Sequence, residues 1–458
     1  MKLDKIISIL EGKKLLILGF GKEGFATYLF LRKIFPEVKL TIADRNENLL
    51  SSYSELKEDG LLDFKLGNNY LNEIDDFEII IKAPGVSFSA NKIIIDSNKI
   101  TSQTDLFLSQ FASQVIGVTG TKGKSTTCSL LFHVLKERFQ DVILVGNIGL
   151  PPFNFIDNIT ENTLIVFELS SHQLEFIKSS PHISILLNIF QEHLDHYNSY
   201  NDYQIAKFNI ASKQIKDDVF IYSSDNEAIN YLMLNNKLNS NLYQFSSESE
   251  NIVNGIYVNN NKLYRKSPSL IEYFYNSNTK IPLKGKHNLL NISAALIACE
   301  ILGVESEFFF NSLSYFQGLP HRIQHVGTFD GIIYYNDSIA TIPEATIQAV
   351  EALEIVDTLI IGGFDRGIDY SLLSDFLMKN NINNVFFMGE AGKRIYNSLI
   401  GIENRNFKIV SDIDEAVILA KRFTQKEKIC LLSPAASSYD NFKNFEHRGD
   451  YFIQLVSK

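Results

Sequence analysis

One glycine-rich stretch, GVTGTKGKSTT at residues 117–127, constrains the fold of this chain more than any other feature. It follows the apolar pair Val115-Ile116 and precedes a helical pattern, SLLFHVLKER. A strand that leads through a glycine turn into a helix points backbone N–H groups out of the helix start, where the helix dipole also favours anions. The stretch therefore predicts a phosphate-binding loop within an α/β domain.

The side chains of this loop suit a nucleoside triphosphate. Lys124 can reach the terminal phosphates, and the hydroxyls of Ser125 and Thr126 can hold a phosphate oxygen or Mg2+. Val118 takes the place of the first glycine of the strict pattern, but the other glycines of the stretch supply similar backbone freedom. We interpret ATP as a substrate or an effector.

The length and composition set the class of protein. The 458 residues predict two or three domains, and a content of 45% hydrophobic and 21% charged residues is typical of a soluble globular protein. No apolar run approaches the roughly 18 residues of a membrane helix, and the first residues, MKLDKIISILEGKK, lack the features of a signal peptide. We expect a cytoplasmic location and no membrane partner.

The charge and the cysteines exclude further classes of function. A net charge of −10 argues against general nucleic-acid binding, so we expect no nucleic-acid partner. The cysteines Cys128, Cys299 and Cys430 have neither the spacing of a disulfide framework nor that of a metal site, which agrees with a reducing compartment. We interpret them as small core residues.

A second glycine motif lies near the start of the chain. Residues 13–45 read as strand, glycine turn, helix and strand, with a G-x-G-x-x-G motif formed by Gly19, Gly21 and Gly24. Asp44 ends the second strand, at the distance expected of an acid that binds a ribose. The pattern alone indicates a dinucleotide or nucleotide-diphosphate site, with a purely structural turn as the alternative. We expect this first domain to end near residue 97.

Polar residues at the ends of later strands indicate a metal site beside the phosphate loop. Glu168 follows an apolar run, where an acid can hold Mg2+ near a triphosphate or can cap a helix. His193 and Asp195 follow the next strand, but neither a third ligand at zinc spacing nor a thiolate accompanies them. Lys207 lies on a helical pattern farther on and, taken alone, reads as a solvated lysine.

The second half of the chain adds a possible base-binding helix and a further domain. His287, Asn288 and Asn291 lie at the start of a predicted helix, where they can contact a base or cap the helix. Residues 240–280 predict a small β subregion. From Gly318 onward, strands alternate with helices in a doubly wound α/β pattern, and the strands end in polar or glycine residues.

As a set, the motifs resemble those of the Mur ligases, the ATP-dependent amide-forming enzymes of bacterial peptidoglycan precursor synthesis. The motifs that carry the resemblance are GTKGKSTT, GNIG, ELSSHQLE, EHLDHY, GKHNLLN, LPHR, NDSIAT and SPAASSYDNFKNFEHRG. The resemblance implies an α/β protein of three domains: a Rossmann-like domain for the UDP substrate at 1–97, a central P-loop ATPase-like parallel-sheet domain at 98–318, and a Rossmann-like glutamate-binding domain at 319–458. We expect a monomer.

The resemblance also implies roles for individual residues. Those implied to bind ATP are Gly120, Thr121, Gly123, Lys124, Ser125, Thr126, His287, Asn288, Asn291, Arg322 and Asp337. Those implied to bind the UDP substrate are Gly19, Gly21, Gly24, Asp44, Arg45 and Asn147. Those implied to receive glutamate are Thr341, Arg366, Ser438 and the backbone near Phe445. The implied metal ligands are Ser125, Glu168, His193 and Lys207, the last as a carbamate formed with CO2. The implied catalytic residues are Lys124, Glu168, His193 and Lys207.

The reaction implied by the resemblance has two steps. ATP phosphorylates the terminal carboxylate of UDP-N-acetylmuramoyl-L-alanine, and the amine of D-glutamate then attacks the acyl phosphate. Two residues depart from the family pattern: Ile339 replaces the lysine of NDSKAT, and Arg366 replaces a lysine after the GG turn. Because a guanidinium offers a planar fork instead of a point charge, L-glutamate stays open as the added amino acid.

Three other functions compete with this interpretation. A ligase that extends folate with glutamate predicts no βαβ unit at the start of the chain, although one is present. An NAD-dependent oxidoreductase uses the first glycine motif but leaves Glu168, Lys207 and the C-terminal SPAASSYDNFKNFEHRG unexplained. A nucleotide-regulated binding protein without activity would not need intact Lys124, Glu168, His193 and Lys207.

Overall fold

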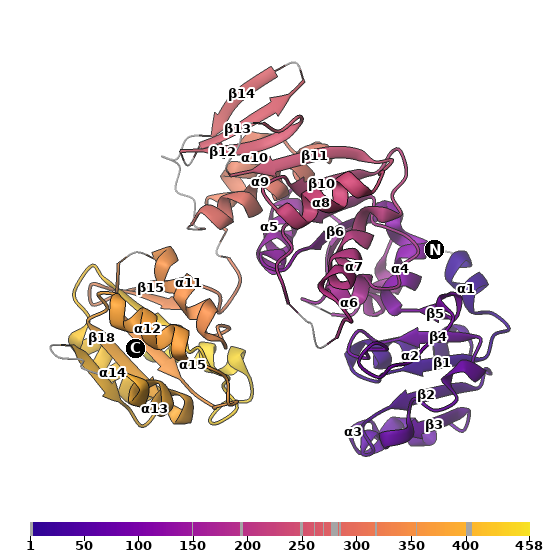
Figure 1. The fold of residues 1–458 in the computed structure, drawn as a ribbon, viewed down its shortest axis with the longest axis horizontal. Coiled ribbons are helices and arrows are strands. Elements are labelled where there is room, and N and C mark those ends of the chain that lie inside the picture. Colours follow the sequence, from indigo (N-terminus) through magenta and orange to yellow (C-terminus); the bar gives the residue numbers. More distant parts are fainter. Residues whose placement is uncertain are drawn as a thin grey trace. The chain divides into compact units, whose positions relative to one another are not determined.

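Three sheets flanked by helices make up the protein, as Figure 1 shows for the computed structural model. The structure describes residues 3–148, 150–192, 196–247, 251–260, 262–268, 270–275, 283, 285–316, 318–353, 355–399 and 405–458. The chain divides into two compact units, Met1–Lys280 with Lys286–Ser314 and Ile281–Gly285 with Tyr315–Lys458. The predicted α/β class is confirmed.

The first sheet is parallel, with the strand order β3-β2-β1-β4-β5 of a Rossmann-like fold. Its strands are β1 (Leu15–Leu18), β2 (Leu40–Asp44), β3 (Leu62–Leu66), β4 (Ile79–Lys82) and β5 (Ile100–Thr101). Its helices are α1 (Asp4–Leu10), α2 (Lys22–Ile34), α3 (Leu49–Ser52) and α4 (Gln103–Phe111). All four residues of β1 are buried, which explains why its sequence is an unbroken apolar run.

The second sheet has the order β14-β13-β12-β11-β10-β9-β6-β8-β7 and is parallel from β7 to β12. Its parallel strands are β6 (Val115–Thr119), β7 (Val142–Gly146), β8 (Leu164–Glu168), β9 (Ile183–Leu186), β10 (Val219–Ser223), β11 (Asn241–Ser246) and β12 (Gly255–Asn259). The strands β13 (Lys262–Ser267) and β14 (Leu270–Tyr275) extend it in antiparallel fashion. These antiparallel strands confirm the β subregion predicted for residues 240–280.

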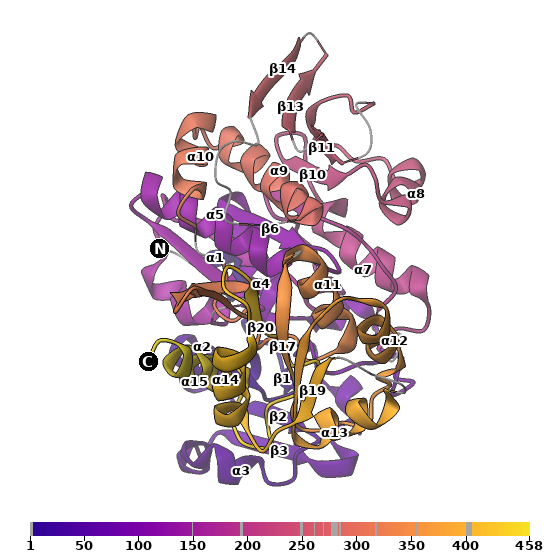
Figure 2. The ribbon, with the colours of Figure 1, turned by 90° about the vertical axis from the view of Figure 1, so that its left-hand side faces the viewer.

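Several helices accompany this second sheet. They are α5 (Lys124–Arg138), α6 (Ser171–Leu174), α7 (Tyr200–Ser212), α8 (Glu227–Asn235), α9 (Lys286–Ile301) and α10 (Ser306–Leu313). Among them, α5, α7 and α9 contact the phosphate loop. Figure 2 shows α9 beside α5, and the two helices are in contact. The run from Ile292 to Cys299 is buried throughout, because α9 packs on α5 on one side and on the sheet on the other.

The first two sheets share an apolar core and lie in the same compact unit. Phe30 of α2 packs on Phe153 with 4.3 Å between ring centroids. The boundary predicted near residue 97 therefore stays a prediction.

No helix among the described residues is long and apolar enough to span a membrane. The three cysteines are buried, as predicted for small core residues.

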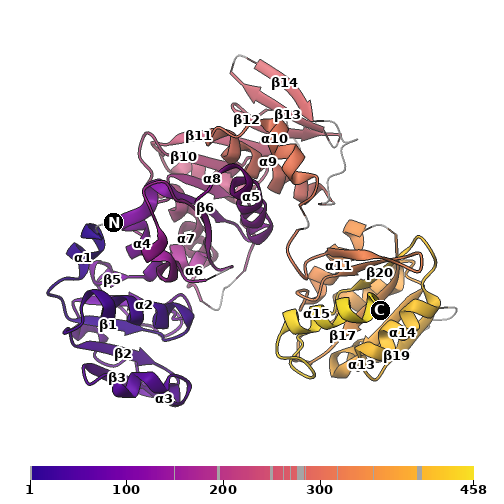
Figure 3. The same cartoon turned by 180° about the vertical axis from the view of Figure 1, so that it is seen from behind.

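The third sheet, in the second unit, has the order β15-β16-β20-β17-β18-β19. Its strands are β15 (Gln324–Phe329), β16 (Ile332–Asn336), β17 (Val356–Gly362), β18 (Asn384–Met388), β19 (Asn406–Ile409) and β20 (Ile429–Leu432). Its helices are α11 (Pro343–Leu353), α12 (Ser371–Lys379), α13 (Gly389–Ser398), α14 (Ile413–Phe423) and α15 (Phe445–Val456). Alternate residues of the central strands pack on α11–α13 and on α14–α15, so helices cover both faces (Figure 3).

Candidate active site

The predicted phosphate loop is a strand–turn–helix unit that joins β6 to α5. Gly123 caps the helix with a φ of +86°, and a Cβ there would lie 2.5 Å from Oδ1 of Asn291. A side chain at this position would therefore be strained and would collide with α9. The structure thus confirms the local fold predicted from the glycines, and it places Ser125 and Thr126 on the first turn of α5.

The segment after β9 holds the phosphate loop from outside. The Asn188 side chain accepts from Lys122 N at 2.8 Å and donates to Lys122 O at 3.0 Å. The Asn188 carbonyl accepts from Thr121 N at 2.9 Å, and Thr121 Oγ1 accepts from Phe190 N at 2.9 Å. Asn188 was not predicted as a site residue, and its only signal in the sequence is its place just beyond a buried strand.

Two lysines converge on one carbonyl of this loop. Lys124 Nζ donates to Gly120 O at 2.8 Å, and Lys207 Nζ donates to the same oxygen at 2.9 Å. Lys207 lies on α7 and is only 2% exposed, so its interpretation as a solvated lysine is wrong. Burial, and secondarily the charge of Lys124, lower the pKa of Lys207 well below its usual value.

Glu168 is the buried carboxylate at the end of β8, next to the strand that leads into the loop. It pairs in register with Val118 of β6, and its Oε1 accepts from Asn147 Nδ2 at 2.8 Å. Its Oε2 is buried and has no hydrogen-bond partner among the residues that the structure describes. A buried carboxylate oxygen left open in this way fits a divalent cation such as Mg2+.

The remaining predicted metal ligands are only partly described. His193 lies outside the described residues, as does the neighbouring Asp195. Within the described ranges, no three His, Cys, Asp or Glu side chains come together as a metal site. Burial raises the pKa of the Cys128 thiol on α5 well above its usual value, and the charge of Glu168 raises it further against the opposing charge of Lys124.

The start of α9 lies against the phosphate loop. Asn291 is buried, and its Nδ2 donates to Asn288 Oδ1 at 3.1 Å while its Oδ1 faces Gly123. His287 is exposed on the first turn of the same helix. The structure thus places Asn291 beside the phosphate loop. The sequence alone allowed Asn291 either to contact a base or to cap the helix.

The first glycine motif has the geometry of a nucleotide-binding turn. Gly19 has a φ of +86°, and a Cβ there would lie 2.9 Å from both Ala83 Cβ and Val86 Cγ2. A Cβ on Gly24 would lie 2.4 Å from Gly19 O, whereas a Cβ on Gly21 would meet nothing within 4 Å. The first and third glycines therefore allow close packing, and the middle one leaves the turn open to a ligand.

Asp44 fixes this glycine turn through hydrogen bonds with the backbone. Its Oδ2 accepts from Phe20 N at 2.6 Å and its Oδ1 accepts from Asn46 N at 2.8 Å. Arg45 follows it and is exposed. Asp44, the acid predicted to bind a ribose, therefore holds the backbone of the glycine turn in place.

In the second unit, Asp337 is buried just after β16. Its Oδ1 accepts from Ile323 N at 3.1 Å and its Oδ2 accepts from Ser433 Oγ at 2.7 Å. Burial raises the pKa of Asp337 to about 7, against the opposing effects of these hydrogen bonds and of Arg322. Arg322 Nε is buried and has no hydrogen-bond partner among the described residues.

Two of the predicted glutamate-binding residues contact each other. Arg366 Nη2 donates to Thr341 O at 3.0 Å. Ser438 is buried in the loop after β20, and the carbonyl of Phe445, the first residue of α15, accepts from Ser338 Oγ at 2.9 Å. Loops at the ends of β16, β17 and β20 thus supply all four predicted positions together with the start of α15.

A buried arginine, to which no role was assigned from the sequence, holds these loops together. Arg448 is 1% exposed and donates to the carbonyls of Ser338, Ala436 and Ser437 and to Ser338 Oγ. Burial lowers its pKa to about 10. The next residue, Gly449, leaves room for His321, whose Nδ1 would lie 2.2 Å from a Cβ.

Curated relatives match this chain from end to end. UDP-N-acetylmuramoylalanine--D-glutamate ligase of Bacillus mycoides is 32% identical over 461 residues, which cover 99% of each chain. The chain belongs to this ligase family. The enzyme of the same name from Bacillus cereus is 31% identical over 464 residues, again 99% of each chain. Residues 118–299 match the Mur ligase middle domain.

Solved structures of other Mur ligases share the fold. UDP-N-acetylmuramate-alanine ligase MurC from Thermotoga maritima superposes with a TM-score of 0.56 at 19% identity, over 97% of this chain and 99% of that one. MurF ligase from Thermotoga maritima, solved in complex with ADP, gives a TM-score of 0.58 at 16% identity, over 100% and 99%. These comparisons do not favour the oxidoreductase or the L-glutamate alternative.

Proposed function

We propose that this member of the Mur ligases joins D-glutamate to UDP-N-acetylmuramoyl-L-alanine at the cost of ATP, in peptidoglycan precursor synthesis. The observation that carries the proposal is the phosphate loop with the open carboxylate oxygen of Glu168 on the adjacent strand. The end-to-end relatives supply the identity of the acceptor and of the amino acid. We further propose that the enzyme acts as a cytoplasmic monomer.

ATP binds at the phosphate loop in this proposal. Backbone N–H groups at the start of α5, with Lys124, Ser125 and Thr126, hold its phosphates. Asn291 and its neighbours His287 and Asn288 lie at the adenine side in this proposal, and Arg322 and Asp337 are further proposed nucleotide-binding residues. These cationic and N–H groups stabilise the charge that develops on the transferred phosphoryl group.

Glu168, Ser125, His193 and a modified Lys207 are the proposed Mg2+ ligands. The open Oε2 of Glu168 is the feature of the described structure that fits the ion. When bound, Mg2+ supplies positive charge that neutralises the phosphate oxygens. Glu168 is itself oriented by Asn147, whose side-chain amide holds the other carboxylate oxygen.

A carbamate on Lys207 accounts for the burial of this lysine. Burial lowers the pKa of Lys207 and so favours the neutral form of the amine, which can attack CO2. An N–C bond forms between Nζ and the carbon of CO2, and one proton leaves the nitrogen. The product is an anion beside the Lys124 ammonium, so a neutral amine is replaced by the negative partner of a favourable pair of opposite charges.

The acceptor and glutamate occupy the remaining proposed residues. The glycine turn of the first sheet, Asp44, Arg45 and Asn147 hold the UDP substrate, whose terminal carboxylate is phosphorylated. Thr341, Arg366, Ser438 and the backbone near Phe445 hold glutamate. Its amine attacks the acyl carbon, the resulting tetrahedral intermediate expels phosphate, and an amide bond remains.

The test is phosphate release with ATP, Mg2+ and UDP-N-acetylmuramoyl-L-alanine, comparing D-glutamate with L-glutamate. We expect release that requires the acceptor and D-glutamate. Release with L-glutamate alone would overturn the stereochemical assignment and direct attention to Ile339 and Arg366. Silence with both amino acids would overturn the proposed reaction.

A further inference from the structure

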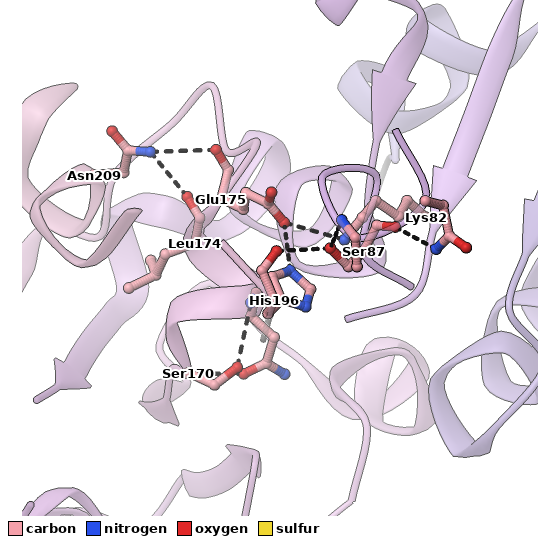
Figure 4. A network of polar contacts seen from close by, with 10 residues as sticks. Lys82, Ser87, Ser170, Leu174, Glu175, His196 and Asn209 are labelled. Atoms are coloured by element: carbon pink, nitrogen blue, oxygen red, sulfur yellow. Dashed lines mark hydrogen bonds and ion pairs between the residues drawn. The ribbon is translucent and has the colours of Figure 1, made fainter. Parts of the chain in front are cut away.

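A buried polar cluster links the first sheet to the segment that follows Glu168, within one compact unit (Figure 4). The segment, residues 170–175, contains the short helix α6. Ser170 and Gln173 close a capping box at its start, so the backbone here is held two residues beyond Glu168. The Asn209 side chain of α7 donates to the carbonyls of Leu174 and Glu175 and fixes its end.

Glu175 is the centre of this cluster. Its Oε2 accepts from Lys82 Nζ and from His196 Nε2, both at 3.2 Å. The exposed side-chain fractions are 2% for Lys82, 15% for Glu175 and 8% for His196. Burial alone would raise the pKa of Glu175, but His196 and Lys82 outweigh it, and the pKa lies below its usual value.

A buried ion pair is weak evidence for stability, because removing the two charges from water costs about as much as their attraction returns. An apolar pair of similar volume would serve the core at least as well. Lys82 and Glu175 do, however, define the position of one segment relative to another. The location of this contact therefore matters more than its strength.

Lys82 leads directly into the loop that packs against the first glycine turn. It is the last residue of β4, and the next residue, Ala83, lies where a Cβ on Gly19 would collide. Farther along the same loop, Ser87 Oγ donates to His196 O at 2.7 Å. His196 is thus held twice, by Glu175 through its ring and by Ser87 through its carbonyl (Figure 4).

A second link runs from the glycine turn itself to the same segment. Glu23 lies between Gly21 and Gly24 on the first turn of α2, and its Oε1 accepts from Gln173 Nε2 at 2.6 Å. The glycine turn of the proposed acceptor site is therefore bonded to residues 170–175 through Glu23, and Lys82, which leads into the loop at 83–87 beside that turn, is bonded to Glu175. Residues 170–175 follow the proposed metal ligand by two positions.

We propose that Glu175 is a positioning residue for the acceptor. Through Lys82, Glu175 fixes the loop at 83–87 relative to the end of the strand that carries Glu168. This inference rests on the proposed function, because it takes the glycine turn as the acceptor site. Glu175 acts through Lys82 and does not itself touch a substrate. Its loss would misplace the loop at 83–87 that packs against the glycine turn of the acceptor site. The phosphate loop would stay intact, since Asn188 and α9 hold it independently.

The test is the substitution Glu175→Gln, with binding of two ligands followed by calorimetry. Removing the negative charge weakens a charge-assisted contact, so we expect the Kd for UDP-N-acetylmuramoyl-L-alanine to rise about tenfold. The Kd for a non-hydrolysable ATP analogue with Mg2+ should stay within about twofold of its value for the unmodified protein. General destabilisation would not weaken the binding of one ligand and spare the other.

A matched control and a second variant separate positioning from folding. Asp59→Asn removes the charge from another partly buried pair of the first sheet, with Arg32 at 2.8 Å, away from the cluster; it should cost stability and leave acceptor binding unchanged. The double variant Lys82→Met/Glu175→Met removes both charges, so it should recover stability but still bind the acceptor weakly. It decides the question even if Glu175→Gln alone does not fold.

Three results would overturn the inference. One is a Glu175→Gln enzyme that binds both ligands like the unmodified protein, and another is a double variant whose acceptor affinity recovers together with its stability. Both leave the proposed function standing. The third is an unmodified protein that does not bind the acceptor, which would overturn the proposed function as well.

Discussion

At the scale of single residues, the buried charges carry the most information. Lys207, Glu168, Asp337 and Arg448 are each at most 4% exposed, although charged side chains are rarely buried so deeply. Glu168 and Asp337 lie at strand ends, and Lys207 and Arg448 reach loops at strand ends from their helices. Burial shifts the pKa values of Lys207, Asp337 and Arg448. Substitution of such residues is informative, because their surroundings predict a specific change in activity or stability.

Substitution of Lys207 by alanine tests the carbamate. We expect Lys207→Ala to lose activity by roughly a hundredfold, since an anionic group beside Lys124 disappears. Added short-chain carboxylates should restore part of the activity, because they can occupy the place of the carbamate. Phosphate release with and without acetate measures the effect, and full activity of the variant without additives would refute the assignment.

Substitution of Asp337 by asparagine tests its raised pKa. The folded pKa of about 7 exceeds the unfolded value of about 4, so the folded state binds the proton more tightly. The stability that this preference contributes is complete below about pH 4 and is lost as the pH rises through 7. Between pH 5 and pH 8 the native protein should therefore lose on the order of 2 kcal/mol relative to Asp337→Asn. Urea unfolding at both pH values measures this, and equal pH dependence of the two proteins would contradict it.

At the scale of elements, loops at strand ends are held by partners that lie elsewhere in the chain. The phosphate loop depends on the segment after β9, because Asn188 pairs with both backbone groups of Lys122. The loops after β16 and β20 depend in the same way on Arg448 of α15. The geometry of each loop is therefore a joint property of two elements.

Removal of the Asn188 side chain should loosen the phosphate loop selectively. Asn188→Ala deletes two hydrogen bonds to Lys122, so we expect the KM for ATP to rise about tenfold. The KM for the acceptor should change little, because the glycine turn of the first sheet makes no use of this clamp. Asn188→Asp keeps the accepting oxygen but cannot donate to Lys122 O, and it should also raise the KM for ATP. Equal effects on both substrates would argue for general destabilisation.

The sequence predicted those features that depend on neighbouring residues. The two glycine turns, the strand–turn–helix order and the α/β class follow from short patterns, and the structure has them. Long-range contacts could not be predicted, because Lys207 meets Gly120 across 87 residues and Arg448 meets Ser338 across 110. For that reason the helical pattern of Lys207, taken alone, did not indicate that this lysine is buried, and the contacts of Asn188, Glu175 and Arg448 could not be predicted from their neighbours in the sequence.

At the scale of the whole molecule, the protein consists of two compact units, each with apolar cores of its own. The first unit contains the phosphate loop and the first glycine turn, and the second contains the proposed glutamate-binding loops. Each unit can therefore respond separately to substitution or denaturant.

Replacement of Arg448 should destabilise one unit alone. Arg448→Met removes four hydrogen bonds that all lie within the second unit, at a cost of about 3 kcal/mol. We expect two unfolding transitions in differential scanning calorimetry, of which only one moves to a lower temperature. A second-unit marker such as the ellipticity of an excised 315–458 fragment identifies the transition, and an equal shift of both would show that the units unfold together.

The burial of all three cysteines has a practical consequence for spectroscopy. Cys128, Cys299 and Cys430 are 0% exposed, and burial raises the pKa of each thiol, so maleimide dyes will not label the folded chain at these positions. The exposed Ile94 and Ile418, at 97% and 66% exposure, lie in different units. Cysteines introduced at these two sites can carry a donor and an acceptor fluorophore without prior removal of native thiols. Energy transfer between the dyes would then report the separation of the units while ATP, acceptor and glutamate are added in turn.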